Sequence, residues 1–329
     1  MAKQEHTSKS SNLAEYAVVA SLFAGLGGAL WYGMHVSTPE KAPATAAAAP
    51  APAAAAVATS VSTSPSPGGA FAPPDARDIP DGPMGEWIRR GEAIFMRTPA
   101  NAVGFSGNSL NCVNCHLDAG RLKGSAPMWG AYPLYPAYRK KTDHVDTFAE
   151  RIRGCFMYSM NGKAPDDGHD ILVALESYAY WMAQKAPTGE KLPGAGFKKA
   201  GEPAETPSYE RGAQVYEAKC ALCHGADGQG QKVDGVAVFP PLWGKDSYNW
   251  GAGMHDIDKA ANFIKNNMPY GNATLTDQQA WDVSTYINSQ ERGQDPRFTG
   301  SVQATAEKFH GGPYSMYGKE VNGKLLKGL

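Results

Sequence analysis

The sequence predicts an all-α protein in which two small helical domains follow one another along the chain. Two pentapeptides carry this prediction, CVNCH at residues 112–116 and CALCH at residues 220–224, and each follows a helix-like segment that opens on Arg-Gly. A Trp-Gly segment comes after each, APMWG at 126–130 and PPLWG at 240–244, and an aromatic helical stretch closes each copy. The two histidines are 108 residues apart and the two tryptophans 114. Such a nearly constant offset indicates tandem copies of one module.

The boundaries of the two copies follow from changes in composition. We expect the first domain to span residues 83–190 and the second residues 208–292. The stretch between them, 186–208, is rich in Gly and Pro and lacks apolar periodicity, which is typical of a connection. Residues 293–329 carry aromatic side chains without helical spacing, and we expect them to wrap back over the domains as a C-terminal tail.

The first 82 residues are predicted to lie outside both domains. Residues 17–34 contain no charged side chain, and this is close to the length that a helix needs to cross a bilayer. We expect residues 1–36 to form an inner-membrane anchor, through residues 17–36, that leaves the rest of the chain in the periplasm. A cleaved signal peptide is the alternative, because small-residue cleavage sites follow. Residues 37–82 are mostly Ala, Pro and Ser, which predicts a disordered linker.

The C-x-x-C-H spacing points to a specific cofactor. Two cysteines on one turn can form thioethers with the two vinyl groups of a haem, and the histidine that follows then projects onto the iron. The alternatives are a Cys₄ zinc site and a thioredoxin-like redox pair. Neither explains why a histidine follows the second cysteine in both motifs. Thioether attachment needs an oxidising compartment, which agrees with export. The predicted haem-binding residues are Cys112, Cys115 and His116 in the first copy and Cys220, Cys223 and His224 in the second.

A haem in a class I cytochrome c domain takes its sixth ligand from a loop late in the domain. In the second copy the candidate is Met268 in NNMPYG, because a Met-Pro pair after an amphipathic helix matches that pattern. Met254 in GAGMHD and the adjacent His255 are the alternatives. Ligation by histidine and methionine raises the haem potential and suits electron transfer.

Cys155 occupies the corresponding place in the first copy. When Ile152 is aligned with Ile264, Cys155 and Phe156 fall where Asn267 and Met268 stand. A thiolate ligand would lower the potential of this haem, so that electrons would run downhill to the second. The alternative is a buried free thiol. Met157 and Met160 are weaker ligand candidates in the first copy.

The charge of the chain excludes one class of partner and favours another. A formal net charge of −1 lacks the basic footprint of a nucleic-acid-binding protein. Residues 117–163 hold eight Lys and Arg against four Asp and Glu, whereas residues 208–292 hold seven against ten. A local positive excess concentrates anions, so we expect an anionic substrate at the first copy. The candidates for contact with it are Arg121 and Arg139, followed by Arg151 and Arg153.

These arginines have two alternative roles, as solvated surface residues or as partners of the haem propionates. Other residues near the motifs are predicted to be structural. Lys140 and Lys141 are expected to be surface charges, and His144 and His169 to be exposed or structural. Two tryptophans, Trp129 and Trp243, are expected to pack against the haems.

Taken together, the strings APMWGAYPLYPAYR, ERIRGCFMYSMNG, FPPLWGKDSYNWGAGM and NNMPYG resemble the dihaem thiosulfate dehydrogenases over about residues 85–320. The resemblance implies two covalently bound haem c groups, with His116 and Cys155 on the first iron and His224 and Met268 on the second. It implies that thiosulfate is oxidised to tetrathionate at the first haem. Electrons would then leave through the second haem to a cytochrome c or a membrane oxidase.

Two further functions stay open from the sequence. A membrane-tethered dihaem electron carrier without its own substrate would have two high-potential haems and no substrate-dependent reduction. The same site run backwards would make a tetrathionate reductase. No feature of the sequence supports a dihaem peroxidase.

Overall fold

The computed structural model describes residues 71–233 and 236–329, which all belong to one compact unit, Ser64–Leu329. The predicted anchor, residues 1–36, and most of the predicted linker lie outside the described residues. Among the residues that are described, no helix combines the length and the apolar character needed to cross a membrane.

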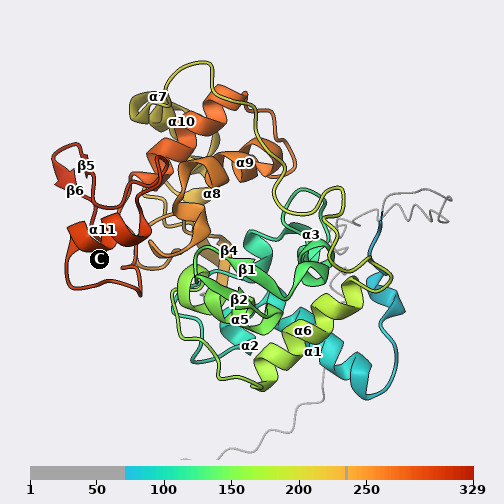
Figure 1. The fold of residues 1–329 in the computed structure, drawn as a ribbon. Helices are drawn as coiled ribbons and strands as arrows, with labels where there is room; N and C mark the ends of the chain where they lie inside the picture. The colour runs from blue at the N-terminus through green and yellow to red at the C-terminus, as the bar shows by residue number, and fades with distance from the viewer. Residues whose placement is uncertain (1–70, 234–235) are drawn as a thin grey trace, which may run out of the picture. The chain divides into compact units, whose positions relative to one another are not determined.

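The first half of the described chain is built around two crossed helices, α1 (Pro83–Met96) and α6 (Asp170–Met182) (Figure 1). Their backbones approach closely at Gly91, where a Cβ atom would lie 2.1 Å from the carbonyl oxygen of Ala174 and 2.8 Å from Cβ of Tyr178. A larger residue would clash with the neighbouring backbone, so glycine is required here. The glycine of the first Arg-Gly pair is therefore explained by helix packing.

The second half repeats this arrangement with α7 (Tyr209–Lys219) and α10 (Asp277–Asn288). A Cβ atom on Gly212 would lie 2.1 Å from the carbonyl oxygen of Asp282 and 2.8 Å from Cβ of Tyr286. In both crossings the glycine of one helix faces a backbone carbonyl of the other helix. It also faces the tyrosine that stands four residues after that carbonyl. This correspondence supports the duplication inferred from the motif offsets.

Further helical segments lie in the loops that precede or connect these paired helices. In the first half they are η1 (Ala76–Asp78), α2 (Thr98–Asn101), η2 (Cys112–Asn114), α3 (Leu117–Gly120), α4 (Met128–Ala131), η3 (Tyr132–Leu134), α5 (Phe148–Gly154) and the π-helical turn η4 (Cys155–Ser159). In the second half they are α8 (Ala221–His224), η5 (Gly253–His255) and α9 (Ile257–Asn267), which packs on α10.

Three small antiparallel hairpins depart from the all-α prediction, so the fold is mostly rather than entirely helical. Each hairpin lies within a loop and has strands of two to four residues, which are too short for an alternating pattern to stand out in the sequence. The pairs are β1 (Ala137–Arg139) with β2 (His144–Asp146), β3 (Gln231–Val233) with β4 (Val236–Phe239), and β5 (Glu320–Val321) with β6 (Lys324–Leu325).

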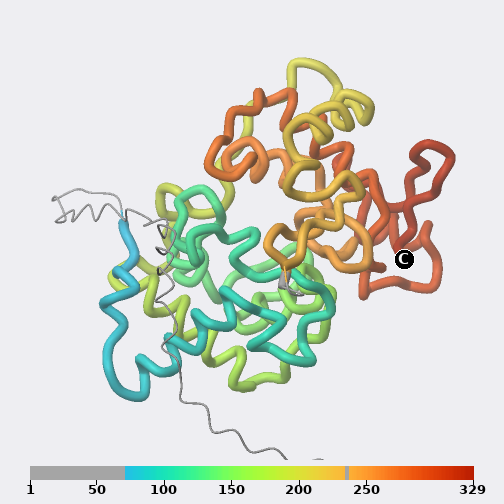
Figure 2. The backbone as a smooth tube through the Cα atoms, turned by 180° about the vertical axis from the view of Figure 1, so that it is seen from behind, coloured from blue at the N-terminus to red at the C-terminus, as the bar shows by residue number. Residues whose placement is uncertain are grey.

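The C-terminal tail contains a helix that the aromatic spacing did not predict, α11 (Val302–Phe309). The hydroxyl of Ser301 caps this helix by accepting a hydrogen bond from the amide of Ala304. Beyond it, Tyr317 and Leu326 are buried in one apolar cluster with Trp250. Both views of the chain show the tail beside the second half (Figures 1 and 2).

Each half has its own hydrophobic core. The core of the first includes Ile88 of α1 and Tyr178 of α6, and that of the second includes Tyr216 of α7 and Val283 of α10. Met254 is partly buried and packs against both cores, so the two halves meet near this residue.

The end of the predicted linker differs from the expectation of disorder. The ring of Phe71 lies 5.4 Å from that of Trp129, and Ile79 packs against the core of the first half. These apolar side chains hold residues 71–82 against the first half.

Candidate active site

His116 is oriented for metal binding by a hydrogen bond on the far side of its ring. Its Nδ1 atom lies 2.7 Å from the carbonyl oxygen of Ala126, so Nδ1 carries the proton and Nε2 keeps a free lone pair. Burial lowers the pKa of His116 to about 4, which keeps the ring neutral. Such a backbone partner is the usual companion of a metal-bound histidine.

His224 repeats this geometry in the second half. Its Nδ1 atom lies 2.9 Å from the carbonyl oxygen of Pro240, and burial lowers its pKa. Ala126 and Pro240 stand three residues before Trp129 and Trp243, respectively. The Trp-Gly segments therefore supply the carbonyl that orients each histidine, a role that the sequence analysis missed.

The two tryptophans themselves are packing residues. Trp129 is fully buried and donates from Nε1 to the carbonyl oxygen of Arg121, 2.9 Å away. Trp243 packs against the second core, and its ring centre lies 5.2 Å from that of Tyr216.

None of the five cysteines forms a disulfide bond with another. Burial raises the pKa of Cys112 to about 12 and of Cys115 to about 11, and nearby Cys155 contributes to both shifts. Cys112 packs against the first core, which also buries Phe156, the residue after Cys155. Free thiols paired with a neutral histidine whose Nε2 is available fit the requirements of haem c at both motifs.

Cys155 is the first residue of the π-helical turn η4 and directly follows α5. Thr147 begins α5 with a capping box in which Glu150 takes part. Arg151 lies one turn before Cys155 and donates from Nη1 to its Sγ atom over 2.7 Å. The side chain of Cys155 is the largest cause that raises the pKa of Arg151, and burial of the guanidinium opposes it. The pair is suited to stabilise a thiolate.

Two more cations approach this region from other segments. The ammonium group of Lys141 donates to the carbonyl oxygen of Gly251 and lies 3.7 Å from the centre of the Tyr158 ring. Most of the Lys141 residue is exposed, but burial of the ammonium, together with Arg297 and Arg151, lowers its pKa to about 7. The guanidinium of Arg297 lies 5.3 Å from the same ring. Lys141 is therefore more than the surface charge that the sequence indicated.

The other candidate arginines have protein partners. Arg139 donates from Nη1 to the hydroxyl of Tyr135, 2.7 Å away. Arg121 donates to the carbonyl oxygen of Pro74, and its guanidinium lies 5.2 Å from the Trp181 ring. Arg153 forms an ion pair with Asp167. None of the three contacts Cys155 as Arg151 does.

The candidate iron ligands in the second half differ in whether their donor atoms already have a hydrogen-bond partner. Met268 directly follows α9 and is partly buried against the second core. Both ring nitrogens of His255 have partners, Nδ1 the carbonyl oxygen of Ala252 and Nε2 the hydroxyl of Ser315. This leaves the sulfur atoms of Met268 and Met254 as the available donors among the three candidates.

Two further histidines of the first half, His169 and His144, occupy structural or exposed positions. His169 begins α6, where its Nδ1 accepts a hydrogen bond from the amide of Ile171. His144 is exposed, and its Nδ1 lies 3.5 Å from a carboxylate oxygen of Asp146.

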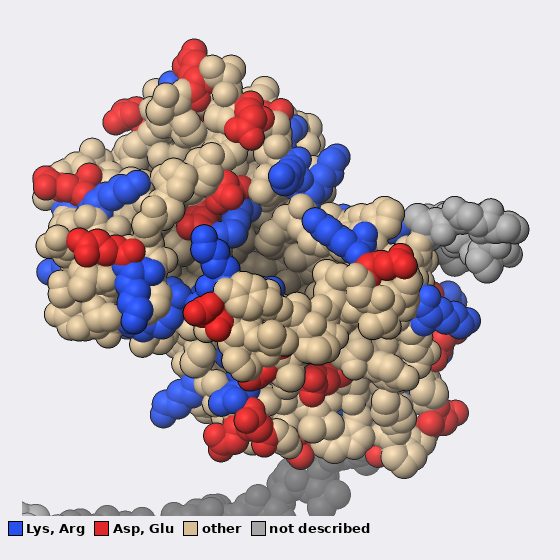
Figure 3. Space-filling view, viewed as in Figure 1, with Lys and Arg blue, Asp and Glu red and all other residues tan. Residues whose placement is uncertain are grey.

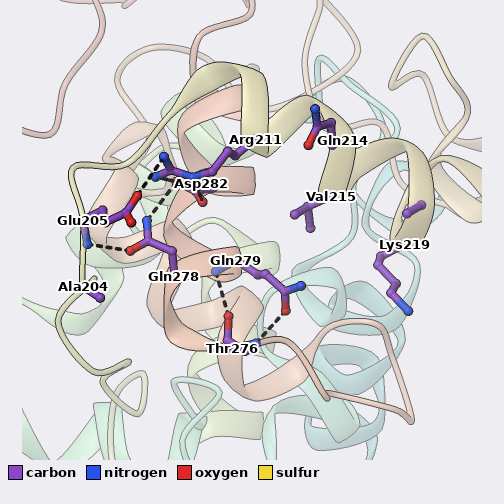
Figure 4. A pocket seen from close by; sticks show the side chains of 11 residues that line it. Ala204, Glu205, Arg211, Gln214, Val215, Lys219, Thr276, Gln278, Gln279 and Asp282 are labelled. Atoms are coloured by element: carbon purple, nitrogen blue, oxygen red, sulfur yellow. Dashed lines mark hydrogen bonds and ion pairs between the residues drawn. The ribbon is translucent and has the colours of Figure 1, made fainter.

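A shallow pocket of about 510 Å³ lies on the second half between α7 and α10, away from the candidate residues (Figure 4). Its arginine, Arg211, is neutralised by ion pairs with Asp282 and Glu205. Positive and negative side chains also alternate across the visible face of the molecule (Figure 3). Neither feature marks a second anion site.

Comparison with known proteins agrees with this site. The family described as cytochrome c oxidase, cbb3-type, subunit III matches residues 207–287. A thiosulfate dehydrogenase of Thiomonas intermedia (strain K12) is 54% identical over 79% of this chain and 83% of its own. One from Stutzerimonas stutzeri (strain A1501) is 51% identical over 78% and 84%. The solved thiosulfate dehydrogenase TsdBA of Marichromatium purpuratum, in its "as isolated" form, has a TM-score of 0.77 and 48% identity over 79% of this chain. The match spans 58% of the TsdBA chain.

The fold and the paired motifs define an oxidoreductase of the c-type cytochrome class. The chain belongs to the thiosulfate dehydrogenase family, which confirms the resemblance and the predicted class of enzyme.

Proposed function

We propose that this chain joins two thiosulfate ions into tetrathionate and that it holds two haem c groups for this purpose. His116 and Cys155 would be the axial ligands of the first, and His224 and Met268 those of the second. The observation that carries the proposal is the 2.7 Å contact between Arg151 and Cys155 beside the first C-x-x-C-H motif. The free Nε2 atoms of both histidines support two haem sites. Bound haem supplies iron that exchanges single electrons.

The reaction balances without a proton: two S₂O₃²⁻ ions give S₄O₆²⁻ and two electrons, and the bond formed joins one sulfur of each ion. Two dianions repel each other, so the protein must supply positive charge where they meet. Arg151 and Lys141 supply it around Tyr158 and Cys155, whereas the charge of Arg297 is neutralised by its ion pair with Asp295. Arg139 and Arg121 stay predictions for substrate contact.

Arg151 has a second role in this proposal, which is to hold Cys155 as a thiolate. A hydrogen bond from a guanidinium to an anionic acceptor is stronger than one between neutral groups. It stabilises the charged sulfur and fixes its direction from the end of α5. The thiolate is thereby available to the iron as a ligand.

We propose that electrons leave the protein through the second haem. Thioether ligation there would raise the potential relative to that of the first haem. We place the protein in the periplasm at the inner membrane, with a cytochrome c or a membrane oxidase as acceptor. Residues 1–36 would anchor it, and the domain limits 83–190 and 208–292 are part of the same proposal.

Stopped-flow reduction of the holoprotein by thiosulfate tests this function. Wild-type protein should be reduced on mixing and should form tetrathionate, whereas Cys155→Gly should bind both haems and lose turnover. Met157→Leu, two residues away in the same turn, serves as the matched control and should retain activity. Full activity in Cys155→Gly would overturn the proposed site. Reoxidation of the reduced protein by tetrathionate, without reduction of the oxidised protein by thiosulfate, would indicate the reverse reaction. A protein that responds to neither ion would be an electron carrier.

A further inference from the structure

Asn249 is a fully buried residue of the second half that contacts the turn carrying Cys155. Its Nδ2 atom donates to the carbonyl oxygen of Met157 over 2.8 Å, and its backbone amide donates to that of Tyr158 over 3.2 Å. Both acceptors belong to η4, and Met157 stands 92 residues before Asn249 in the chain. A loop of the second half thus holds the residues that follow the proposed ligand of the first iron.

The side-chain amide of Asn249 has its orientation fixed by its partners. Its Oδ1 atom accepts from the backbone amide of Gly251, 2.9 Å away, and only the oxygen of the side chain can accept. The Nδ2 atom therefore faces Met157, and it also donates to Oδ1 of Asn161 over 3.0 Å. Every polar atom of the side chain has a partner, so the contact with the turn is made in a single orientation.

The carbonyl of Met157 depends on this contact for its hydrogen bond. The amide of Gly162, which follows the π-helical turn, donates to the carbonyl of Phe156. The next carbonyl along the chain is that of Met157, and its donor is the Nδ2 atom of Asn249. A carbonyl that is covered by protein and loses its donor carries a free-energy penalty. The turn should therefore relax to another path when this donor is removed.

The loop that presents Asn249 is itself fixed. Residues 247–252, between β4 and η5, are all buried. The hydroxyl of Ser247 donates to the carbonyl oxygen of Pro241 over 3.0 Å, and Trp250 packs in the apolar cluster of the C-terminal tail. A side chain that is locked on a rigid support can define the position of the group that it contacts.

We propose that Asn249 is a positioning residue for Cys155, through which the second half of the chain helps to set the sulfur against the first haem iron. The inference rests on the haem ligands of the proposed function. Arg151 and α5 hold Cys155 from the side that precedes it. Asn249 holds the turn from the side that follows it, through the backbone and without a contact to substrate.

Loss of this contact should change the first haem and leave the second unchanged. A thiolate ligand pushes electron density to the iron and lowers its potential. When the turn relaxes, the sulfur of Cys155 is held less well, so the thiolate signal of the first haem should weaken and its potential should rise. A residue needed only for the stability of the fold would leave the iron ligands of the folded protein unchanged.

The experiment compares the full holoprotein with Asn249→Ser by electron paramagnetic resonance and spectroelectrochemistry. A serine hydroxyl can still accept from the amide of Gly251 in the same kind of turn, but it lacks the two protons of Nδ2. Asn266→Ser is the matched control, because Nδ2 of Asn266 likewise ties two distant segments by donating to the carbonyl oxygen of Lys198, 68 residues earlier.

We expect Asn249→Ser to weaken the thiolate signal and to raise the potential of the first haem. Asn266→Ser should keep the wild-type signal and the wild-type potential at that haem. Urea unfolding of both variants establishes the conditions under which each is folded when its spectrum is recorded.

A wild-type thiolate signal and wild-type potentials in Asn249→Ser would overturn the inference while the haem ligands stand. Equal changes in Asn249→Ser and Asn266→Ser would also overturn it, because they would mean a general effect on stability. If Asn249→Ser fails to take up haem, Asn249→Asp decides. It keeps the size of the side chain and offers at most one donor, so its thiolate signal must differ from that of the wild type. A wild-type protein without a thiolate signal would instead contradict the proposed function.

Discussion

Arg151 and Cys155 lie one helical turn apart, and Nη1 of the guanidinium is 2.7 Å from Sγ of the thiol. The geometry depends on α5 continuing directly into the π-helical turn that Cys155 begins. A π-helical turn inside or after an α-helix is frequently found at functional sites. Here Cys155 stands at the junction between α5 and the π-helical turn, and its partner Arg151 lies on the preceding turn.

Replacement of Arg151 by Gln should lower kcat/KM for thiosulfate by about 10- to 100-fold. That is the range expected for loss of a hydrogen bond to a charged group, about 1.5–3 kcal/mol. Arg153→Gln is the control, because Arg153 pairs with Asp167. Steady-state kinetics with an artificial electron acceptor would measure both variants. Equal losses in the two variants would contradict a specific role for Arg151.

Thiosulfate binding should weaken as the pH rises through about 7. Burial, Arg297 and Arg151 lower the pKa of Lys141 to about 7, so its charge is present below that pH and lost above it. Loss of this single charge should raise KM by about 2- to 5-fold, as expected for up to about 1 kcal/mol. Lys141→Arg keeps its charge at all these pH values and should remove the dependence. A KM that rises equally in wild type and Lys141→Arg would exclude Lys141 as the cause.

Substitution of either crossing glycine by alanine should destabilise the protein. A Cβ atom on Gly91 or Gly212 would lie 2.1 Å from a backbone carbonyl oxygen, so the helices must separate. Overpacking of this kind costs about 1–3 kcal/mol. Gly312→Ala is the control, since its added Cβ would meet nothing within 4 Å. Urea unfolding followed by circular dichroism should show lower midpoints for Gly91→Ala and Gly212→Ala only.

The C-terminal tail should depend on the ionised carboxylate of Asp295. Burial by itself would raise the pKa of Asp295, but hydrogen bonds from His310 and Arg297 outweigh it and hold the pKa well below its usual range. Because the folded pKa is depressed, this stability is present above about pH 4, the usual value for Asp, and is lost as the pH falls below it. Asp295→Asn should lose about 3 kcal/mol at pH 7 and show a weaker acid dependence. An Asp295→Asn protein with wild-type acid sensitivity would contradict this account.

The sequence predicted the features that depend on local spacing. The two C-x-x-C-H motifs, the repeated Arg-Gly and Trp-Gly pairs and the place of Cys155 after a helix are all readable from the order of residues. Roles that depend on where a side chain points were not predicted. Lys141 looks like a surface lysine, yet its ammonium lies over Tyr158, a contact between residues 17 positions apart in the chain.

The same limit applies to Arg292 and to the hairpins. Nothing near Arg292 in sequence indicates that its guanidinium is fully buried between Tyr248 and Trp250, because that burial arises from packing of α10 against a loop about 40 residues earlier. Strands such as β5 (Glu320–Val321) are too short to give a periodic signal. Both kinds of feature are set by tertiary contacts.

The most direct test of the central claim is electron paramagnetic resonance of the oxidised holoprotein, wild type against Cys155→Met. We expect a low-spin ferric signal typical of thiolate ligation in the wild type, and its replacement by a signal without thiolate character in Cys155→Met. A wild-type spectrum that lacks the thiolate signal, or one that Cys155→Met leaves unchanged, would contradict the assignment of Cys155 to the iron.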